Sequence, residues 1–289
     1  MTIISIGLDA EFMSYISGLA KKDNPVYPKT VEGRDLGLMH FGCDEFGHCL
    51  EARPKEATTA GGLVTNTMKA MEALPEGLSY VSENAHLMGK KMFIALVKLQ
   101  GGKELPTCKN IYGGEILDDC KADLDARKAG KRLLFCGMHI HVSAKKVVKE
   151  SFKIDGKTTS KDVEIPIKLP FKSLVYLFDK YLFEPLKHDK DFNIGRYRSP
   201  GFYELKRADG SHFEYRSLGS SAFTPERLYI IFEIIEELIN NFDHHVISNL
   251  QLSLGVGSKE TKKLNRLVMA LANTVQFTGD LRKLWVPWR

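Results

Sequence analysis

Residues 136–143, Cys-Gly-Met-His-Ile-His-Val-Ser, decide how the rest of the chain is interpreted. The side chains of a β-strand alternate between its two faces. As a strand, this stretch has an apolar face and a polar face, with Met138, Ile140 and Val142 opposite His139, His141 and Ser143. The pattern predicts a strand whose underside belongs to a core and whose upper side meets something polar. Taken alone, it fits equally well a half-buried strand with two solvated histidines.

Three other segments repeat this alternation with charged side chains. In the first segment Asp9 and Glu11 alternate with Leu8, Ala10 and Phe12. In the second, Glu51 and Arg53 alternate with Leu50 and Ala52. In the third, Glu214 and Arg216 alternate with Phe213 and Tyr215. The last segment belongs to a predicted hairpin over 202–218. Each segment also has an ordinary explanation, such as an edge strand facing water or a cross-strand salt bridge.

The combined pattern predicts a metal site. On one concave surface the four segments would contribute four carboxylates and two imidazoles. Two anions roughly 7 Å apart repel by about 2 kcal/mol at an effective dielectric near 20, so such a surface needs cations. Oxygen-rich ligation with some imidazole suits Mg²⁺ or Mn²⁺ better than Zn²⁺. With Arg216 and Arg198 beside the metals, the set is typical of phosphoryl transfer.

Length and periodicity predict one α+β domain over residues 1–289. The chain is 43% hydrophobic and 27% charged, and it is long enough to bury a substantial core. Four helices are expected, over about 59–74, over 171–185, over 224–242 and from about 258 onward. Pro185 is expected to end the second of them. A strand pair is expected around the Asp155-Gly156 turn.

The location is predicted from what the sequence lacks. No run approaches the about 18 apolar residues of a membrane span. The N-terminus has no secretion signal. Five scattered cysteines without CxxC spacing favour reduced thiols in a cytoplasm. We therefore expect a cytoplasmic protein with no membrane partner.

The net charge of +5 is unevenly distributed along the chain. Residues 127–172 hold twelve Lys and Arg against four Asp and Glu. Such a run usually marks a solvated face. A polyanionic ligand or nucleic acid is the alternative, but no aromatic residues interleave the lysines as single-strand binders require. We expect no nucleic-acid partner.

Four motifs together resemble a known superfamily. They are Gly-Leu-Asp-Ala-Glu-Phe (7–12), Leu-Glu-Ala-Arg-Pro (50–54), Gly-Met-His-Ile-His-Val-Ser (137–143) and Phe-Glu-Tyr-Arg-Ser-Leu (213–218). In this order they resemble the carboxylate–amine ligases of the glutamine synthetase and glutamate–cysteine ligase superfamily, above all the phage-encoded COOH–NH2 ligases (amidoligases). The H-x-H strand followed by E-x-R is the specific part of the resemblance, which covers residues 5–220 approximately.

The resemblance implies a fold and a set of site residues. The fold would be a glutamine-synthetase-like catalytic core, a curved and mostly antiparallel sheet with helices packed on its outer face. Metal ligands are implied at Asp9, Glu11, Glu51, His139 and Glu214. His141 would lie close to nucleotide phosphates, and Arg216, with Arg198, would contact the transferred phosphate. Asp9 departs from the family pattern, since many members have Glu at this position.

The implied activity is ATP- and Mg²⁺-dependent ligation, with Mn²⁺ as an alternative metal. ATP phosphorylates a substrate carboxylate to an acyl phosphate, and an amine then displaces phosphate to give an amide. The expected partners are small-molecule or peptide carboxylates and amines. An oligomer is compatible with the sequence, and the location would be the host-cell cytoplasm if the protein is phage-encoded.

Three other functions stay open at this point. A guanidino-kinase-like or other ATP phosphotransferase would use the same fold type without ligation. A zinc-dependent hydrolase would use His139 and His141 as metal ligands. A non-catalytic phage accessory protein would retain the fold for binding, with the basic stretch 127–172 as its contact.

Overall fold

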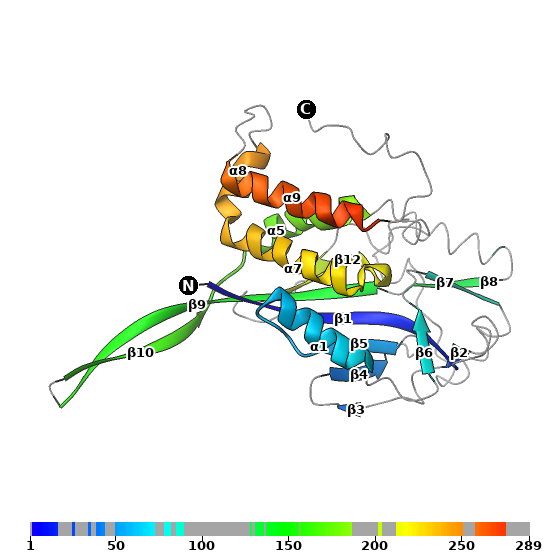
Figure 1. Cartoon of the computed structure of the whole chain (residues 1–289), viewed down its shortest axis with the longest axis horizontal. Coiled ribbons are helices and arrows are strands. Elements are labelled where there is room, and N and C mark those ends of the chain that lie inside the picture. The colour runs from blue at the N-terminus through cyan, green and yellow to red at the C-terminus, as the bar shows by residue number, and fades with distance from the viewer. Residues whose placement is uncertain are drawn as a thin grey trace.

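The computed structural model describes residues 2–16, 25–26, 34–35, 39–43, 50–72, 78–81, 85–89, 128, 131–135, 137–155, 157–186, 202–203, 212–250 and 258–275. Over these ranges the chain combines helices with an antiparallel sheet (Figure 1), so the predicted α+β class is confirmed. Arg198 lies outside the described residues.

Two long strands form the centre of the sheet: β1 (Thr2–Ile16) and β9 (Gly137–Ile154). In the described part of the chain ten strands join this sheet, in the order β11-β12-β9-β1-β5-β4-β3, with β10 paired to β9 and with β2 and β6 paired to β1. The other strands are β2 (Pro25–Val26), β3 (Arg34–Asp35), β4 (Met39–Cys43), β5 (Leu50–Pro54), β6 (Leu78–Val81), β10 (Lys157–Pro166), β11 (Phe202–Tyr203) and β12 (His212–Gly219). A separate pair is formed by β7 (Ala85–Gly89) and β8 (Lys131–Phe135).

The alternation predicted for the motif strands is confirmed. Ten alternating side chains of these strands face the core: Ile4, Ile6, Leu8, Ala10 and Phe12 of β1, Met138, Ile140 and Val142 of β9, and Phe213 and Tyr215 of β12. Each of them is at most 3% exposed. Burial of this apolar area is the main driving force for the fold.

Helices cover this apolar face of the sheet. They are α1 (Ala60–Glu72), α5 (Phe171–Phe178), η2 (Asp179–Phe183), α6 (Glu184–Leu186), η4 (Ser220–Ala222), α7 (Pro225–Asn240), α8 (Phe242–Leu250) and α9 (Lys259–Asn273). Helix α7 lies between α1 and α9 (Figure 1). The helices expected to start at about 224 and 258 do so, with Thr224 as the cap of α7 and Ser258 as the cap of α9. Among the helices of the described residues, none is long and apolar enough to cross a membrane.

The helix predicted over 171–185 is interrupted, and its expected end at Pro185 is wrong. A π-helical turn, η2, follows α5, and the helical run continues through Pro185 to Leu186. Proline has no N–H to donate and its ring disturbs α-helical hydrogen bonding at the preceding turn. The wider turn lies just before Pro185, where this disturbance falls. Local spacing alone does not reveal such a turn.

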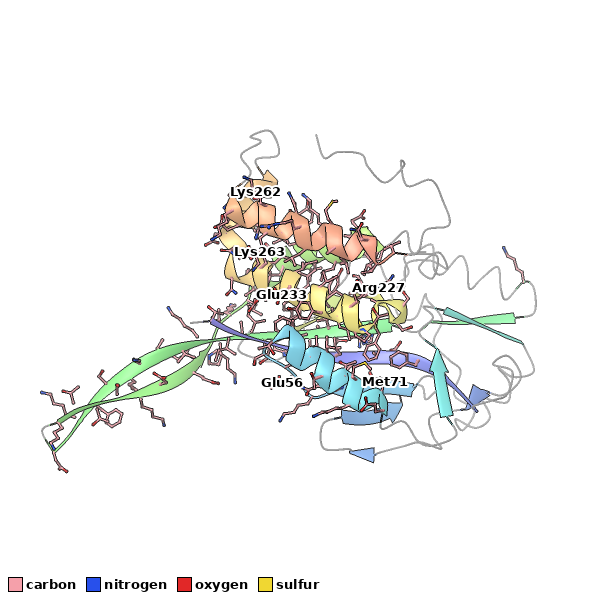
Figure 2. All side chains as sticks on the ribbon, viewed as in Figure 1. Glu56, Met71, Arg227, Glu233, Lys262 and Lys263 are labelled. Atoms are coloured by element: carbon pink, nitrogen blue, oxygen red, sulfur yellow. The ribbon has the colours of Figure 1, made fainter. Side chains whose placement is uncertain are left out.

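Arg227 ties the start of α7 to the end of α9 (Figure 2). Its guanidinium is buried and donates to the Ser221 carbonyl at 2.7 Å, to the Thr274 carbonyl at 2.8 Å and to Thr274 Oγ1 at 2.9 Å. A buried cation needs its hydrogen bonds satisfied. These three contacts satisfy much of the donor capacity and fix two helices against each other.

A two-stranded arm extends from the sheet (Figure 1). Beyond Lys146 strand β9 leaves β1 and pairs only with β10, as far as Ile154, in the described residues. The predicted turn is confirmed: Asp155 has a φ of 48°, a left-handed conformation that Asp tolerates better than most residues. One strand of the arm, β9, is therefore the same strand that carries His139 and His141.

Candidate metal centre

Strands β1, β5, β9 and β12 bring the predicted polar side chains to the face of the sheet opposite the helices. The antiparallel register places Glu11 opposite Glu51 and Asp9 opposite His139. Glu214 on β12 lies opposite His141 on β9. Since directly opposed residues share a face, segments that are far apart in the sequence converge on one surface.

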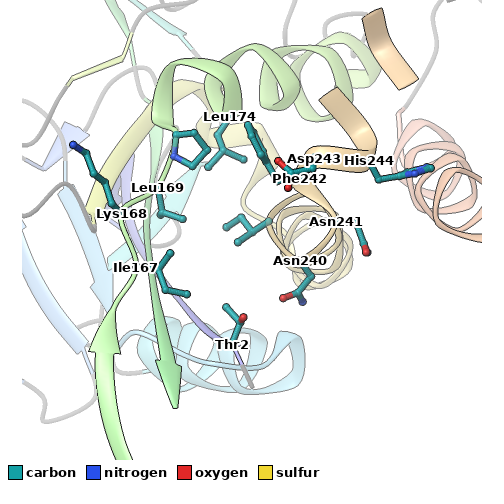
Figure 3. A pocket seen from close by; sticks show the side chains of 12 residues that line it. Thr2, Ile167, Lys168, Leu169, Leu174, Asn240, Asn241, Phe242, Asp243 and His244 are labelled. Atoms are coloured by element: carbon teal, nitrogen blue, oxygen red, sulfur yellow. The ribbon is translucent and has the colours of Figure 1, made fainter. Parts of the chain in front are cut away.

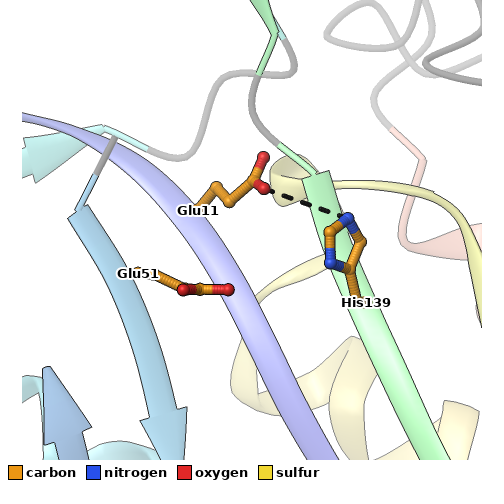
Figure 4. A group of neighbouring side chains, drawn as sticks. All are labelled: Glu11, Glu51 and His139. Carbon is orange, nitrogen blue, oxygen red and sulfur yellow. Dashed lines mark ion pairs between the residues drawn. The ribbon is translucent and has the colours of Figure 1, made fainter. Parts of the chain in front are cut away.

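Glu11, Glu51 and His139 form a buried group. Their exposed fractions are 6%, 5% and 2%, respectively. One potential ligand atom from each lies within 4.8 Å of the others. Figure 4 shows the three side chains projecting from three neighbouring strands toward one another. This is a carboxylate–carboxylate–imidazole set of the kind that can hold a divalent cation.

The imidazole of His139 lies between two carboxylates. Its Nε2 is 3.9 Å from Glu11 Oε1, the ion pair drawn in Figure 4, and its Nδ1 is 3.2 Å from Glu214 Oε1. The other oxygen of Glu11 accepts the backbone N–H of Gly137 at 2.7 Å. These contacts fix the Glu11 carboxylate with one oxygen directed at the imidazole.

Two arginines stand beside the acidic residues on the same face. Arg53 donates from Nη2 to Glu51 Oε2, and its Nε lies 3.7 Å from Asp9 Oδ1. Arg216 donates from Nε to Glu214 Oε1. In both cases the arginine follows its glutamate by two residues, so the two side chains leave one strand on the same side. The guanidiniums offset part of the negative charge of the site.

A second chain of contacts lies next to the buried group. Asp9 Oδ2 is 2.9 Å from His141 Nε2, and His141 Nδ1 is 3.2 Å from His212 Nε2. Burial alone would lower the pKa of His141, but the hydrogen bond with Asp9 and the charges of Asp9 and Glu214 outweigh burial and the charge of Arg216. The pKa of His141 is therefore raised above its usual value.

The predicted site residues are placed as follows. Glu11, Glu51 and His139 come together as one group, and Glu214 contacts its imidazole. Asp9 lies beside the group and contacts His141. His141 and Arg216 are on the same face. The roles assigned to these residues stay predictions.

Two residues of this face were not among the predicted site residues. Arg53 contacts Glu51 and Asp9, and His212 contacts His141. The signal for both is the alternation already used: Arg53 shares a face with Glu51, and His212 shares a face with Glu214. His212 also needs the register between β12 and β9, which the sequence does not supply.

The arrangement suits cation binding coupled to anion binding. Carboxylates at the centre offer hard oxygen ligands, and imidazoles offer one or two nitrogen ligands. The arginines at the edge present donors that fit phosphate or carboxylate oxygens. Comparison of the chain with protein-family models and with curated proteins found no match.

Proposed function

We propose that this chain is an ATP- and Mg²⁺-dependent carboxylate–amine ligase that forms an amide through an acyl phosphate. The observation that carries the proposal is the buried group of Glu11, Glu51 and His139. The order and spacing of the four motifs, which resemble those of amidoligases, supply the reaction type. The carboxylate and amine would be small molecules or peptides.

The residues of the group fit a hard divalent cation. Burying two carboxylates directly opposite each other is unfavourable unless positive charge lies between them. Asp9 and Glu214 add two further carboxylates within reach of the histidines. An oxygen-dominated donor set favours Mg²⁺ or Mn²⁺ over Zn²⁺. Such a cation would neutralise phosphate charge and polarise a phosphoryl oxygen.

The arginines then have a role in binding phosphate. In the structure the Glu214 carboxylate accepts the Arg216 Nε–H. If a cation takes up the charge of Glu214, the guanidinium becomes available for phosphate oxygens, which it can bind through two parallel hydrogen bonds. Arg53, whose side chain is 42% exposed, has the same relationship to Glu51. Arg198 is proposed as a further phosphate contact.

The finer fold assignment is part of the proposal. We propose that β1, β5, β9 and β12 correspond to the strands of a glutamine-synthetase-like core, with the helices on the outer face of the sheet. A cytoplasmic location, in the host cell if the protein is phage-encoded, accords with ATP as a substrate.

Isotope transfer tests the reaction directly. The purified protein is incubated with ATP, Mg²⁺ and pools of amines and ¹⁸O-labelled carboxylates, and products are analysed by mass spectrometry. Ligation through an acyl phosphate moves one ¹⁸O from the carboxylate to inorganic phosphate and yields an amide. Glu214→Gln should abolish both products, whereas Glu72→Gln, at the exposed end of α1 on the helix side of the sheet, should retain both.

The other outcomes separate the alternatives. ADP together with a stable phosphorylated product and no amide would indicate a kinase-like phosphotransferase. One tightly bound zinc per chain with ATP-independent hydrolysis would indicate a hydrolase. No binding of ATP in the presence of Mg²⁺ would indicate a non-catalytic protein, and each of these three results would overturn the ligase proposal.

A further inference from the structure

His212 lies on the polar face of the sheet, next to the buried metal group but outside it. It is on β12, two residues before Glu214, and its side chain is half-buried. Its Nε2 is 3.2 Å from Nδ1 of His141, and the two rings are tilted by 33° with their centroids 5.4 Å apart. The other ring nitrogen of His141, Nε2, is 2.9 Å from Asp9 Oδ2. The three side chains therefore form one hydrogen-bonded network, Asp9–His141–His212.

The sheet leaves room for this network at the two positions directly opposite His141. On β1 the opposite residue is Gly7, which has no side chain. On β12 the opposite residue is Glu214, whose Oε1 lies 3.2 Å from the neighbouring imidazole of β9. Diagonal neighbours in a sheet are within reach of long side chains. Asp9 and His212 are such diagonal neighbours, and they contact the ring of His141 from two sides.

The network fixes which nitrogen of His141 carries a hydrogen atom. An ionised carboxylate only accepts hydrogen bonds, and a neutral imidazole has one donor and one acceptor nitrogen. Nε2 of His141 therefore donates to Asp9, and in the neutral ring Nδ1 accepts the Nε2–H of His212. A partner on each ring nitrogen sets both the tautomer and the orientation of an imidazole.

Asp9 is engaged on both carboxylate oxygens by groups other than the metal group. Its Oδ2 contacts His141, and its Oδ1 is 3.7 Å from Nε of Arg53. The side chain of Asp9 is 22% exposed, whereas those of Glu11 and Glu51 are almost completely buried. Asp is one methylene group shorter than the Glu that many amidoligases have at this position. The shorter side chain reaches His141 and stays at the edge of the metal group.

The network is separate from the pocket on the other side of the sheet. That pocket has a volume of about 430 Å³ and is lined, among others, by Leu174, Asn240, Asp243 and His244 (Figure 3). None of the described residues that line it belongs to the polar face of the sheet. Asn240, which is exposed at the end of α7, therefore offers a control position far from the network in the fold.

We propose that Asp9 and His212 are positioning residues, which hold the imidazole of His141 in one tautomer and one orientation. What His141 then does rests on the proposed ligase function: its ring lies close to the nucleotide phosphates, and a ring that is already held in place needs no reorganisation during the reaction. Partners that orient the histidine ligands of metal sites contribute about 10- to 100-fold to activity. We expect an effect of this size from His212, and we assign Asp9 to His141 rather than to the cation.

NMR spectroscopy of the metal-free protein tests the contacts. In EDTA, the protein labelled with ¹⁵N-histidine should show a downfield, slowly exchanging Nε2–H signal, which is assigned to His141 by its loss in His141→Ala. Asp9→Asn keeps an acceptor oxygen and should retain the signal, whereas Asp9→Leu should lose it. His212→Gln keeps a donor for Nδ1 and should retain slow exchange, whereas His212→Phe should exchange at least tenfold faster.

Turnover tests the positioning role. At saturating ATP and Mg²⁺, His212→Phe should lower kcat about 10- to 100-fold, and His212→Gln should recover most of this loss. Phe fills the same space without a donor, so the difference between the two variants isolates the hydrogen bond. The Mn²⁺ affinity should stay within about threefold of that of the unaltered chain in both variants, because His212 lies outside the metal group. Asn240→Ala should change neither kcat nor the ring N–H signal.

Three results would overturn the proposal. They are a His141 N–H signal that is absent from the unaltered chain, a signal that does not respond to Asp9→Leu and His212→Phe, and equal kcat values for His212→Phe and His212→Gln. Failure of the ligase function has a different signature. The unaltered chain would then form neither ADP nor amide, while the N–H signal and its response to the substitutions would still establish Asp9 and His212 as the residues that position His141.

Discussion

Glu11 and Glu51 lie directly opposite each other on β1 and β5, and both carboxylates are almost completely buried. Like charges in this position destabilise a sheet, and burial makes the cost larger. Two anions about 5 Å apart repel by about 3 kcal/mol at an effective dielectric near 20. The Arg53 guanidinium and the Gly137 N–H offset part of this repulsion. The remaining repulsion destabilises the sheet in the absence of a cation, and it is the reason why we propose that the pair holds one.

Neutralising one member of this pair should stabilise the metal-free protein. Glu11→Gln keeps an oxygen that can accept the Gly137 N–H and removes one of the two charges. We expect the melting temperature in EDTA to rise by about 2–4 °C, which corresponds to about 1 kcal/mol for a chain of this size. Scanning fluorimetry in EDTA measures this shift, with Glu72→Gln, at the exposed end of α1, as the unaffected control. A lower melting temperature for Glu11→Gln would mean that the pair is already balanced.

Divalent cations should stabilise the protein through His139. A ligand that binds only the folded state adds about 2.7 kcal/mol at 100 times its dissociation constant. We expect Mg²⁺ and Mn²⁺ to raise the melting temperature, and His139→Ala to weaken Mn²⁺ binding about 10- to 100-fold. Electron paramagnetic resonance of Mn²⁺ measures the affinity without relying on turnover.

His212→Ala is the matched control for this measurement. His212 contacts His141 at 3.2 Å but is not one of the three residues whose ligand atoms converge. Its replacement should leave the Mn²⁺ affinity within about threefold. Equal losses in His139→Ala and His212→Ala would place the cation between the two histidine strands instead of beside Glu11 and Glu51.

The alternation of side chains could be predicted from the sequence, whereas the contacts between them could not. That Glu11, His139 and Glu214 leave their strands on the polar side follows from a period of two. His139 contacts Glu214, although the residue paired with Glu214 is His141. This diagonal contact depends on the register and twist of β9 and β12, which set the positions of their side chains relative to each other. No local pattern encodes this relationship.

The length of β9 shows the same limit. The sequence predicts a strand around His139 and a second strand pair around Asp155, and both are confirmed. Nothing in the polar, lysine-rich stretch between them indicates that one continuous strand joins the site to the tip of the arm. The π-helical turn at Asp179 was also not predicted, because Pro185 was expected to end the helix and the helical run instead continues through it after a wider turn.

The two faces of β12 should respond differently to substitution. Tyr215 is fully buried and donates from its hydroxyl to Asp179 Oδ1 at 2.8 Å. Tyr215→Phe should lower the free energy of unfolding by about 1 kcal/mol, since it removes the hydrogen bond to Asp179, and should not change turnover at 25 °C. If Arg216 contacts the transferred phosphate as proposed, Arg216→Lys, on the polar face, should reduce turnover at least 100-fold with little change in melting temperature, because Lys cannot bind phosphate through a planar pair of donors.

Urea unfolding and ADP release measure these two effects separately. Phe213→Ala, a second core change, should cost about 3–5 kcal/mol and serves as the reference for a pure stability defect. If Tyr215→Phe abolished turnover, or if Arg216→Lys unfolded the protein without affecting ADP release per folded molecule, the assignment of the two faces would be wrong.

His245 on α8 should make the fold sensitive to acid. Its imidazole is 1% exposed, with Nε2 3.4 Å from Glu237 Oε1, and Lys263 donates to the other Glu237 oxygen at 2.8 Å. Burial lowers the pKa of His245 below its usual value, and the charge of His244 lowers it further. The hydrogen bond with Glu237 and the charges of Glu237 and Glu260 raise the pKa, but they offset only part of this lowering. The folded state therefore binds the proton less readily than the unfolded state does.

The sign of the pH effect follows from this difference. Above about pH 6.5 both states hold a neutral imidazole, and the contribution of His245 to stability is fully present. As the pH falls below 6.5 the unfolded state takes up the proton first, so the free energy of unfolding decreases by at most about 1.4 kcal/mol per pH unit until the folded pKa is reached. His245→Gln should remove this part of the slope. Urea unfolding at pH 7.5, 6.5 and 5.5 measures it: the curve of the variant should be flatter than that of the unaltered chain below pH 6.5, and two parallel curves would show that His245 titrates alike in both states.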